Sequence, residues 1–396
     1  MTTKIGLVAG EPSGDLLAAR MMAGLSKQVH PIRFEGIGGP AMRTQGLAQW
    51  YPMDALSVFG YVDALKRLPG LLHTYSGVRS RWLKEKPDIF VGIDAPDFNL
   101  RLEKTLKQAG VPTVHFVGPS IWAWRYSRIH AIRESVSHML VLFPFETQLY
   151  QREGIPVTFV GHPLADLIPN EPDRTAAQTR LGLDPTRKVL AVLPGSRASE
   201  VRLLSARFLQ AVQLLQKQMP DLQVVVPMVN AQRRREFEIF LRENRIEHLL
   251  LIDKAIQEGR PAAWEAMEAA DAVLVASGTA TLETALFKRP MVISYVLSPM
   301  MRRLMAWKSG QEKPYVPWVG LPNVLLQDFV VPELLQEQAT PEKLAEACWK
   351  ALSDKDYVLD VEEKFRHLHR TLQCDTPKRA ADAILKVLNR ETGSTV

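Results

Sequence analysis

Residues 87–125 constrain the fold more than any other part of the chain. Ile89–Ile93 is a short run of apolar, largely branched residues, which is typical of a strand buried on both faces. Pro96 ends the strand pairing, and apolar residues spaced four apart then predict a helix closed by Gly110. A second apolar run, Thr113–Val117, predicts another buried strand. Together these elements form a βαβ unit, whose crossover makes the two strands parallel.

Two carboxylates follow the first of these strands. Asp94 and Asp97 stand at its carboxyl end, which is where open α/β sheets bind their ligands. A group-transfer reaction needs a base to accept a hydroxyl proton, and a carboxylate in this position could supply it. The structural role open to both aspartates is to cap the helix that begins near Phe98.

The length of 396 residues predicts two domains, because one core rarely grows that large. The polar, proline-containing stretch 169–185 marks the boundary between them. We therefore predict an N-terminal domain over residues 1–168, a second domain over 186–331, and helices over 332–396 that close the second domain or pack on a partner chain. The predicted fold class is α/β, with two Rossmann-like, doubly wound domains and a helical C-terminal segment.

The second half repeats the alternation of strands and helices. Its short apolar runs are Lys188–Leu193, Leu222–Val226, His248–Ile252, Ala272–Ala276 and Pro290–Tyr295. Most of them are separated by segments with helical periodicity, which predicts a second parallel sheet.

The composition narrows the class of protein. The chain is 46% hydrophobic and 23% charged, as in soluble globular proteins, and its net charge of +6 suits contact with phosphates or anionic headgroups. No basic stripe is interleaved with aromatic residues, so no nucleic-acid partner is expected. Cys348 and Cys374 lack the close spacing of a metal site, and we expect neither a metal nor a cofactor.

The hydropathy of the chain predicts no secretion signal and no membrane span. Ile5–Gly10 is shorter than the roughly 7–15 apolar residues of a signal peptide, and the acidic Glu11 follows it. The longest uncharged run, Gln108–Trp124, is broken by prolines and glycines, whereas a spanning helix needs about 20 mostly apolar residues. Any membrane contact is therefore expected to be peripheral.

The segment Ala64–Trp82 places leucines beside lysines and arginines, as in surfaces that rest on an anionic bilayer. The leucines proposed for this contact are Leu65, Leu68, Leu71 and Leu72. Pro69 and Gly70 are expected to interrupt any helix here. The alternative is a broken amphipathic helix whose leucines pack on the sheet.

A glycine-containing loop, Gly10–Asp15, joins the first predicted strand to the first helix. Its glycines let backbone N–H groups converge, so an anion or a sugar could bind there. Ser13 and Asp15 are the candidate ligand contacts. The alternative is an ordinary tight turn in which one of these two side chains caps the helix.

Two turns in the second half are suited to a nucleotide diphosphate. Their candidate ligand contacts are Gly195, Ser196 and Arg197 in the first turn, and Ser277, Gly278 and Thr279 in the second. A guanidinium can bind two phosphate oxygens, and a helix N-terminus favours an anion. Glu283, one turn into the following helix, can accept both hydroxyls of a ribose. Each turn taken alone could equally be an ordinary capped βα turn.

Five motifs occur in a characteristic order. They are AGEPSGD at residues 9–15, VGIDAPDFN followed by PSIWAWR in the central unit, LPGSR at 193–197, ASGTATLE at 276–283 and LPN at 321–323. In content and order they closely resemble lipid A disaccharide synthase, the bacterial glycosyltransferase family that joins two acylated glucosamines. The resemblance covers nearly the whole chain, up to about residue 390, and implies the two-domain GT-B architecture.

The resemblance also implies a reaction. The family transfers 2,3-diacylglucosamine from UDP-2,3-diacylglucosamine to the 6-hydroxyl of 2,3-diacylglucosamine 1-phosphate with inversion, giving a β(1→6) disaccharide 1-phosphate and UDP. It favours Asp97 over Asp94 as the base, because Asp97 lies in the APDFN core of the motif. Arg197 is the candidate for stabilising the departing diphosphate, because that step needs positive charge. Asn323 lies in LPN, which matches a family motif near the donor site.

Location and assembly follow from the same resemblance. Lipid substrates favour the membrane role of the leucine segment, and they place the enzyme in the cytoplasm, at the inner face of the bacterial inner membrane. The family's tendency to exchange C-terminal segments implies a homodimer.

Other functions share some of these features. A UDP-N-acetylglucosamine epimerase, or a transferase with a soluble acceptor, would keep the fold without an acyl requirement. A non-catalytic nucleotide-sugar binder at the membrane would bind UDP without releasing it from a donor. Trp122 and Trp124 could line an acyl or sugar site, or pack in the core beneath their turn.

Overall fold

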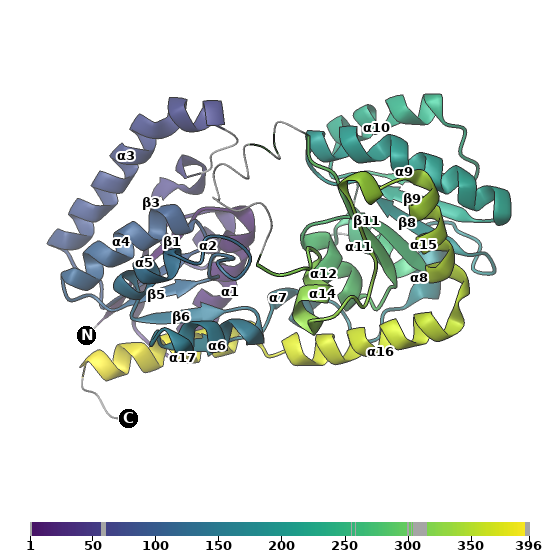
Figure 1. The fold of residues 1–396 in the computed structure, drawn as a ribbon. Coiled ribbons are helices and arrows are strands. Elements are labelled where there is room, and N and C mark those ends of the chain that lie inside the picture. Colours follow the sequence, from purple (N-terminus) through teal and green to yellow (C-terminus); the bar gives the residue numbers. More distant parts are fainter. Residues whose placement is uncertain are drawn as a thin grey trace. The chain divides into compact units, whose positions relative to one another are not determined.

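The computed structural model describes residues 2–56, 61–254, 256–257, 259–298, 301, 303 and 315–392, with the side chains of residues 61–68 and 391–392 left out. The chain divides into two compact units (Figure 1). Unit 1 comprises Met1–Asp166 and Leu372–Val396, and unit 2 comprises Leu167–Thr371. Each unit contains one parallel sheet flanked by helices, as the repeated strand and helix patterns predicted.

The sheet of unit 1 has seven parallel strands in the order β3-β2-β1-β4-β5-β6-β7. The strands are β1 (Thr3–Ala9), β2 (Ile32–Gly38), β3 (Leu47–Pro52), β4 (Ile89–Ile93), β5 (Thr113–Phe116), β6 (His138–Val141) and β7 (Val157–Phe159). The order reverses between β1 and β4, where Ala9 pairs with Ile93. Such a switch point opens a crevice at the carboxyl ends of the strands.

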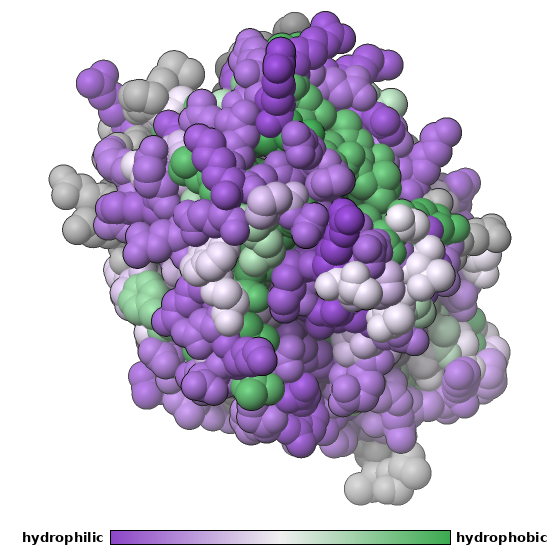
Figure 2. All heavy atoms as spheres, turned by 90° about the vertical axis from the view of Figure 1, so that its right-hand side faces the viewer, coloured by the Kyte–Doolittle hydropathy of each residue, from purple (hydrophilic) through white to green (hydrophobic). Residues whose placement is uncertain are grey.

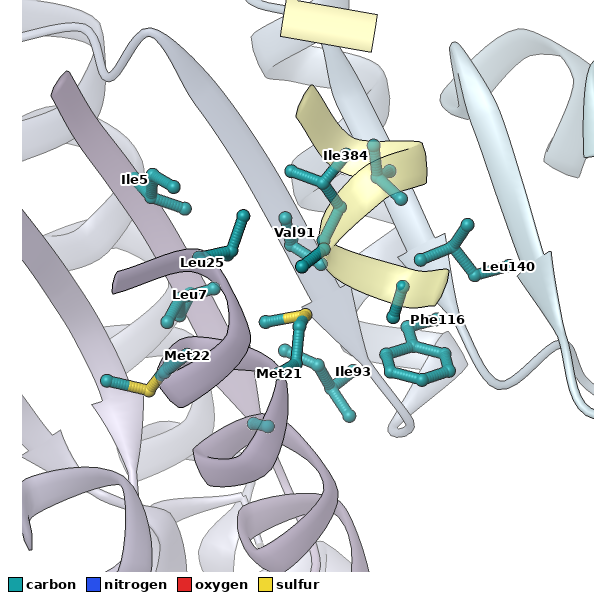
Figure 3. Close-up of a cluster of buried hydrophobic side chains, with 14 of the residues drawn as sticks. Ile5, Leu7, Met21, Met22, Leu25, Val91, Ile93, Phe116, Leu140 and Ile384 are labelled. Atoms are coloured by element: carbon teal, nitrogen blue, oxygen red, sulfur yellow. The ribbon is translucent and has the colours of Figure 1, made fainter. Parts of the chain in front are cut away.

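Helices cover both faces of this sheet. They are α1 (Pro12–Ser26), α2 (Pro40–Thr44), the 3₁₀ turn η1 (Met53–Ala55), α3 (Tyr61–Lys84), α4 (Pro96–Gln108), α5 (Arg128–Ser135), α6 (Pro144–Arg152), α7 (Pro163–Leu167) and α17 (Thr376–Thr392). Figure 3 shows Met21 of α1 and Ile384 of α17 meeting Val91, Phe116 and Leu140 of the strands. On the other face, Trp82 of α3 packs edge-on against Phe90, with the ring centroids 5.1 Å apart.

The sheet of unit 2 repeats the same order with six parallel strands, β10-β9-β8-β11-β12-β13. The strands are β8 (Val189–Leu193), β9 (Gln223–Pro227), β10 (Leu249–Ile252), β11 (Ala272–Ala276), β12 (Met291–Tyr295) and β13 (Glu333–Leu335). Its switch point lies between β8 and β11, where Leu193 pairs with Val275. The two Rossmann-like sheets confirm the predicted fold class.

The described helices of unit 2 bury apolar residues to different extents. They are α8 (Arg174–Arg180), α9 (Ala198–Gln218), α10 (Ala231–Glu243), α11 (Ala262–Ala269), α12 (Thr279–Leu286), α14 (Leu321–Leu326), the 3₁₀ turn η2 (Gln336–Gln338), α15 (Pro341–Ser353) and α16 (Lys355–Leu372). Helix α10, for example, buries only Phe237. Figure 2, turned from the view of Figure 1, accordingly shows a face where hydrophilic residues predominate around a narrow hydrophobic band.

The division into units differs from the predicted domains in two places. Within the predicted linker, α8 packs on unit 2, since the Arg180 guanidinium contacts Glu265 and Glu268 at 2.9 and 2.8 Å. The C-terminal residues also do not form one segment. Helix α15 packs on the sheet of unit 2, whereas α17 buries Ile384 in the core of unit 1, because each carries an apolar stripe that fits a different sheet.

The expected break at Pro69 and Gly70 is wrong. Helix α3 runs without interruption from Tyr61 to Lys84, with Pro69 inside it. A helix tolerates an internal proline at the cost of one backbone hydrogen bond, and packing of the following turns offsets that cost. Within the described part of the chain, no helix is long and apolar enough to cross a membrane.

Candidate functional site

The loop after β4 places Asp94 at the switch point of unit 1. Its Oδ1 accepts a hydrogen bond from the Gly10 N–H at 2.7 Å, and its Oδ2 accepts one from the Glu11 N–H at 3.2 Å. Burial raises the pKa of Asp94 to about 7, although these backbone hydrogen bonds lower it. A carboxylate with such a pKa is suited to accept a proton near neutral pH.

Asp97 lies three residues further on, in quite different surroundings. It occupies the first turn of α4, its side chain is 89% exposed, and Oδ1 accepts a hydrogen bond from the Arg128 guanidinium at 2.7 Å. The N-cap residue of α4 is Ala95, and the helix has no side-chain capping hydrogen bond. Neither aspartate therefore caps α4. The structural alternative left open for both aspartates, capping of this helix, is therefore wrong: the oxygens of Asp94 bind the loop after β1 instead.

The glycine loop of unit 1 holds Ser13 and Asp15 in different ways. Ser13 is exposed in the first turn of α1. Asp15 is buried, and its oxygens accept hydrogen bonds from the N–H groups of Gly39, Ala41 and Met42 at 2.8–3.0 Å. Asp15 thus caps α2 rather than its own helix, and those three bonds occupy both of its oxygens.

In unit 2, a pocket of about 620 Å³ opens at the switch point between β8 and β11. Both predicted turns and the predicted carboxylate line it: Gly195, Ser196, Arg197, Ser277, Gly278, Thr279 and Glu283. Gly278 is the N-cap of α12 and has no neighbouring atom within 4 Å of where a Cβ would stand. The backbone at the start of α12 is therefore open on the side where a Cβ would stand, and this helix N-terminus, which favours an anion, lies in the pocket wall.

The first of these turns is organised by Glu200, which the sequence analysis overlooked. Glu200 Oε2 accepts hydrogen bonds from the N–H groups of Ser196 and Arg197 at 3.0 and 3.1 Å. Its Oε1 lies 3.1 Å from the Arg197 guanidinium, whose side chain is 76% exposed. Glu200 stands three residues after the N-cap Arg197, the position from which a glutamate can bond the N-cap N–H, and that spacing is visible in the sequence.

Two further predicted donor residues differ in their placement. Glu283 is half-buried in the pocket wall, and burial raises the pKa of its carboxyl. Asn323 is fully buried and does not belong to the pocket lining. Its amide donates to the Val331 carbonyl and to Glu333, both at 2.8 Å, so it joins α14 to the strand β13.

The leucines predicted to meet the membrane separate into distinct environments. The side chains of Leu65 and Leu68 lie outside the described residues. Leu71 is half-buried and packs with Val78 and Trp82 against the core of unit 1. Leu72 is 55% exposed. In α3, Leu71 therefore fits the alternative of packing on the sheet, and its neighbour Leu72 fits the alternative of an exposed surface.

The tryptophans of the central unit are both half-buried. Trp122 packs edge-on against Phe145, with the ring centroids 5.4 Å apart. Among the described residues, no group of three or more His, Cys, Asp and Glu side chains could hold a metal ion.

Sequence comparison identifies the family of this chain. Residues 5–384 match the model of the lipid-A-disaccharide synthetase family. The chain belongs to this family. The lipid-A-disaccharide synthase of Bordetella petrii is 66% identical over 389 residues, which cover 98% of this chain and 99% of that protein. The synthase of Aromatoleum aromaticum is 50% identical, over 98% of this chain and 97% of that protein.

Solved structures of low identity share the fold. UDP-GlcNAc 2-epimerase from Neisseria meningitidis, bound to UDP-GlcNAc, has a TM-score of 0.60 at 12% identity and covers 98% of this chain and 100% of its own. The epimerase from Methanocaldococcus jannaschii has a TM-score of 0.58 at 14% identity, with the same coverage. These values establish the two-unit GT-B fold, and at such identity they say nothing of the reaction.

Proposed function

We propose that this member of the lipid-A-disaccharide synthase family uses Asp94 as its base and binds UDP in the pocket of unit 2. As a family member the chain is a glycosyltransferase of lipid A biosynthesis. It transfers 2,3-diacylglucosamine from UDP to 2,3-diacylglucosamine 1-phosphate, releasing the disaccharide 1-phosphate and UDP. The proposal concerns which residues carry that transfer and how the enzyme meets its lipid substrates.

The contrast between the two aspartates supports the assignment of the base. Inversion requires a base that removes the proton of the acceptor 6-hydroxyl as the hydroxyl oxygen attacks the anomeric carbon. Asp94 combines a fixed geometry with a pKa of about 7. Asp97 is 89% exposed, and its Oδ1 already bonds the Arg128 guanidinium, so it lacks the fixed, buried setting of Asp94.

We assign the stabilisation of the departing diphosphate to unit 2. Negative charge develops on the diphosphate as the glycosidic bond breaks, and fixed dipoles or cations stabilise it. The N-terminus of α12, which no side chain of its N-cap residue caps, and the exposed guanidinium of Arg197 both line the pocket. Glu283 in the same wall is the carboxylate placed to accept ribose hydroxyls. Ser196, Ser277 and Thr279 add hydroxyl groups for the phosphates.

The lipid substrates require access to a bilayer. We place the enzyme at the inner face of the inner membrane, with α3 as the contact, because the exposed Leu72 and the exposed cation Arg79 stand seven residues apart, on one face of the helix. We also propose a homodimer, on the family resemblance alone. In the structure, α17 packs in the core of unit 1 of the same chain.

The decisive activity test is incubation with UDP-diacylglucosamine and diacylglucosamine 1-phosphate, followed by product analysis. The disaccharide 1-phosphate and UDP are expected in equal amounts. Conversion of UDP-GlcNAc to its 2-epimer, or UDP binding without release from a donor, would instead indicate the alternative functions.

The base assignment is tested by a matched pair of variants. Asp94→Asn should lower kcat by roughly two to four orders of magnitude, because the isostere keeps the shape and loses the basicity. Asp97→Asn should cost less than about tenfold, since it removes only an exposed ion pair. The reverse pattern would return the role to Asp97. UDP affinity should be unchanged in both variants, because the UDP pocket is in unit 2.

A further inference from the structure

Asp94 lies in a backbone conformation that its surroundings have to maintain. The φ angles of Asp94 and Ala95 are 51° and 39°, in the left-handed region that residues with a side chain rarely adopt. Two such residues in succession persist only where other contacts determine the conformation. A carboxylate on this turn would lose its position if those contacts were absent.

Asn99 supplies contacts of this kind from below the turn. It is fully buried on α4, and its amide lies 2.9 Å from the carbonyl oxygen of Asp94 and 3.2 Å from that of Ile93. The same nitrogen lies 3.3 Å from the carbonyl oxygen of Val8 in β1. One side chain therefore ties the turn to the ends of both strands at the switch point.

A buried pair of ionisable groups lies next to Asn99. Glu103 of α4 and His115 of β5 are both completely buried, and Oε1 lies 2.8 Å from Nδ1. Gly92 makes room for them, because a Cβ there would stand 2.3 Å from Oε1 of Glu103 and 2.9 Å from Cβ of Asn99. Gly92 also pairs with His115 in the register of β4 and β5.

We propose that Asn99, together with the Glu103 and His115 pair, positions Asp94 for proton transfer. The inference rests on the proposed role of Asp94 as the base. Asn99 fixes the turn, and the imidazole of His115 supplies positive character beneath the carboxylate. None of the three touches substrate in this proposal, so they are positioning residues rather than catalytic ones.

The chemistry of the cluster supports a role beyond folding. A buried carboxylate and imidazole are costly to desolvate, and apolar residues of similar volume would stabilise a fold at least as well. Burial raises the pKa of Glu103, and His115 opposes that rise. The other groups that face Asp94 are the backbone N–H groups of Gly10 and Glu11 and the Glu11 carboxylate.

The test compares two buried amides. Asn99→Asp removes the donor to the turn, and Gln178→Glu is its control in unit 2. Gln178 is fully buried, donates to the Ala269 carbonyl at 3.0 Å, and, like Asn99, has a side-chain oxygen without a hydrogen-bond partner in the described residues. At equal folded fraction, measured by thermal melts, Asn99→Asp should lower kcat roughly tenfold to hundredfold with UDP affinity unchanged. The control should keep its kcat.

A second variant tests the electrostatic part without removing volume. Glu103→Gln removes the carboxylate that bonds Nδ1 of His115, and His115 is one of the groups whose charge lowers the pKa of Asp94. The pKa of Asp94 should then rise, and the acid limb of kcat against pH should move to higher pH. A merely structural role would change the melting temperature and leave this limb in place.

The outcomes separate this inference from the proposed function. If Asp94→Asn is inactive while both Asn99→Asp and Glu103→Gln retain the kcat and pH profile of the parent, the positioning role is refuted and the base assignment stands. If Asp94→Asn remains fully active, the base assignment is refuted, and this inference with it. A loss of kcat in Gln178→Glu equal to that in Asn99→Asp would also overturn the inference, because burial alone would explain both.

Discussion

The switch points of the two sheets have the same topology but contain different groups. In unit 1, the loop after β1 closes on the protein's own carboxylate, with Gly10 and Gly14 packed against Asp94. In unit 2, Glu200 occupies one turn, and the neighbouring turn at Gly278 opens into the pocket. One switch point therefore holds a reactive group in place, and the other leaves room for a ligand.

The glycines explain this difference. At Gly14 a Cβ would stand 1.7 Å from Oδ2 of Asp94, whereas at Gly278 it would meet no atom within 4 Å. The glycine in unit 1 is needed for contact within the protein. The glycine in unit 2 keeps the backbone accessible to a phosphate.

The largest effects are expected when each of these two glycines is replaced by alanine, because the two switch points should then respond differently. Gly14→Ala must displace Asp94, so kcat should fall on the order of a hundredfold or more, as for misplacement of a reacting group by about 1 Å. Gly278→Ala should leave the melting temperature unchanged and act only through weaker UDP binding. Steady-state kinetics and UDP titration measure the two effects. Full turnover in Gly14→Ala would contradict the described packing of Asp94.

The second prediction concerns the open switch point alone. Arg197→Ala and Glu283→Gln should each weaken UDP binding by ~1–3 kcal/mol, about fivefold to 150-fold, through loss of a charged hydrogen bond. The effect of Arg197→Ala should shrink at high salt, because that side chain is exposed. Calorimetric titration at two salt concentrations measures both. Asn323→Ala is the contrast: it should lower stability, because its bonds join α14 to β13. Unchanged affinity in Arg197→Ala and Glu283→Gln would move the donor site elsewhere.

How far the sequence predicts these sites depends on whether contacts are local. Apolar runs marked the buried strands β4, β8 and β11 within one or two residues, because strands covered on both faces are continuously apolar. The edge strands β3 and β13 escaped prediction, since their residues are mostly half-exposed. The residues of the two predicted turns of unit 2 follow their strands directly and line the pocket, whereas Glu200, which also lines it, was missed.

The unit 1 site depends on contacts across more than eighty residues. Spacing placed Asp94 and Asp97 at the end of one strand, yet it carried no information on Gly10 and Glu11, which bond Asp94 from the other side of the switch point. The partners of Asp15 could not be foreseen for the same reason, because they stand 24 to 27 residues away. Local motifs thus identify an open ligand site more readily than a site built by tertiary contacts.

The third prediction follows from the pKa of Asp94. If Asp94 must be ionised to accept a proton, kcat should fall about tenfold for each pH unit below 7. The free energy of unfolding should depend on pH in the opposite direction, falling as the pH rises. Burial raises the folded-state pKa from 3.8 to about 7, so the folded state favours the protonated carboxyl, and stability is lost as pH rises from about 4 to 7.

Asp94→Asn removes this titration and checks the sign. Its melting temperature should match the parent near pH 4 and exceed it at pH 8, where the parent must keep a buried carboxylate ionised. Asp97→Asn serves as the control, because that exposed carboxylate gives no comparable burial effect. A melting difference that is the same at both pH values would contradict the raised pKa.

The smallest effect is expected on the surface of α3, where adjacent leucines separate membrane contact from packing. Leu72 is 55% exposed, and returning that half of a leucine to water should cost about 1 kcal/mol, roughly a fivefold loss of binding to anionic vesicles. Leu72→Ser should therefore release protein from sedimented vesicles without changing its melting temperature. Leu71→Ser should do the reverse, because Leu71 packs against the core of unit 1 and its loss leaves a cavity. An unchanged partition in Leu72→Ser would exclude this position from the membrane contact, whereas a fall in its melting temperature as large as that of Leu71→Ser would show that both leucines serve the fold.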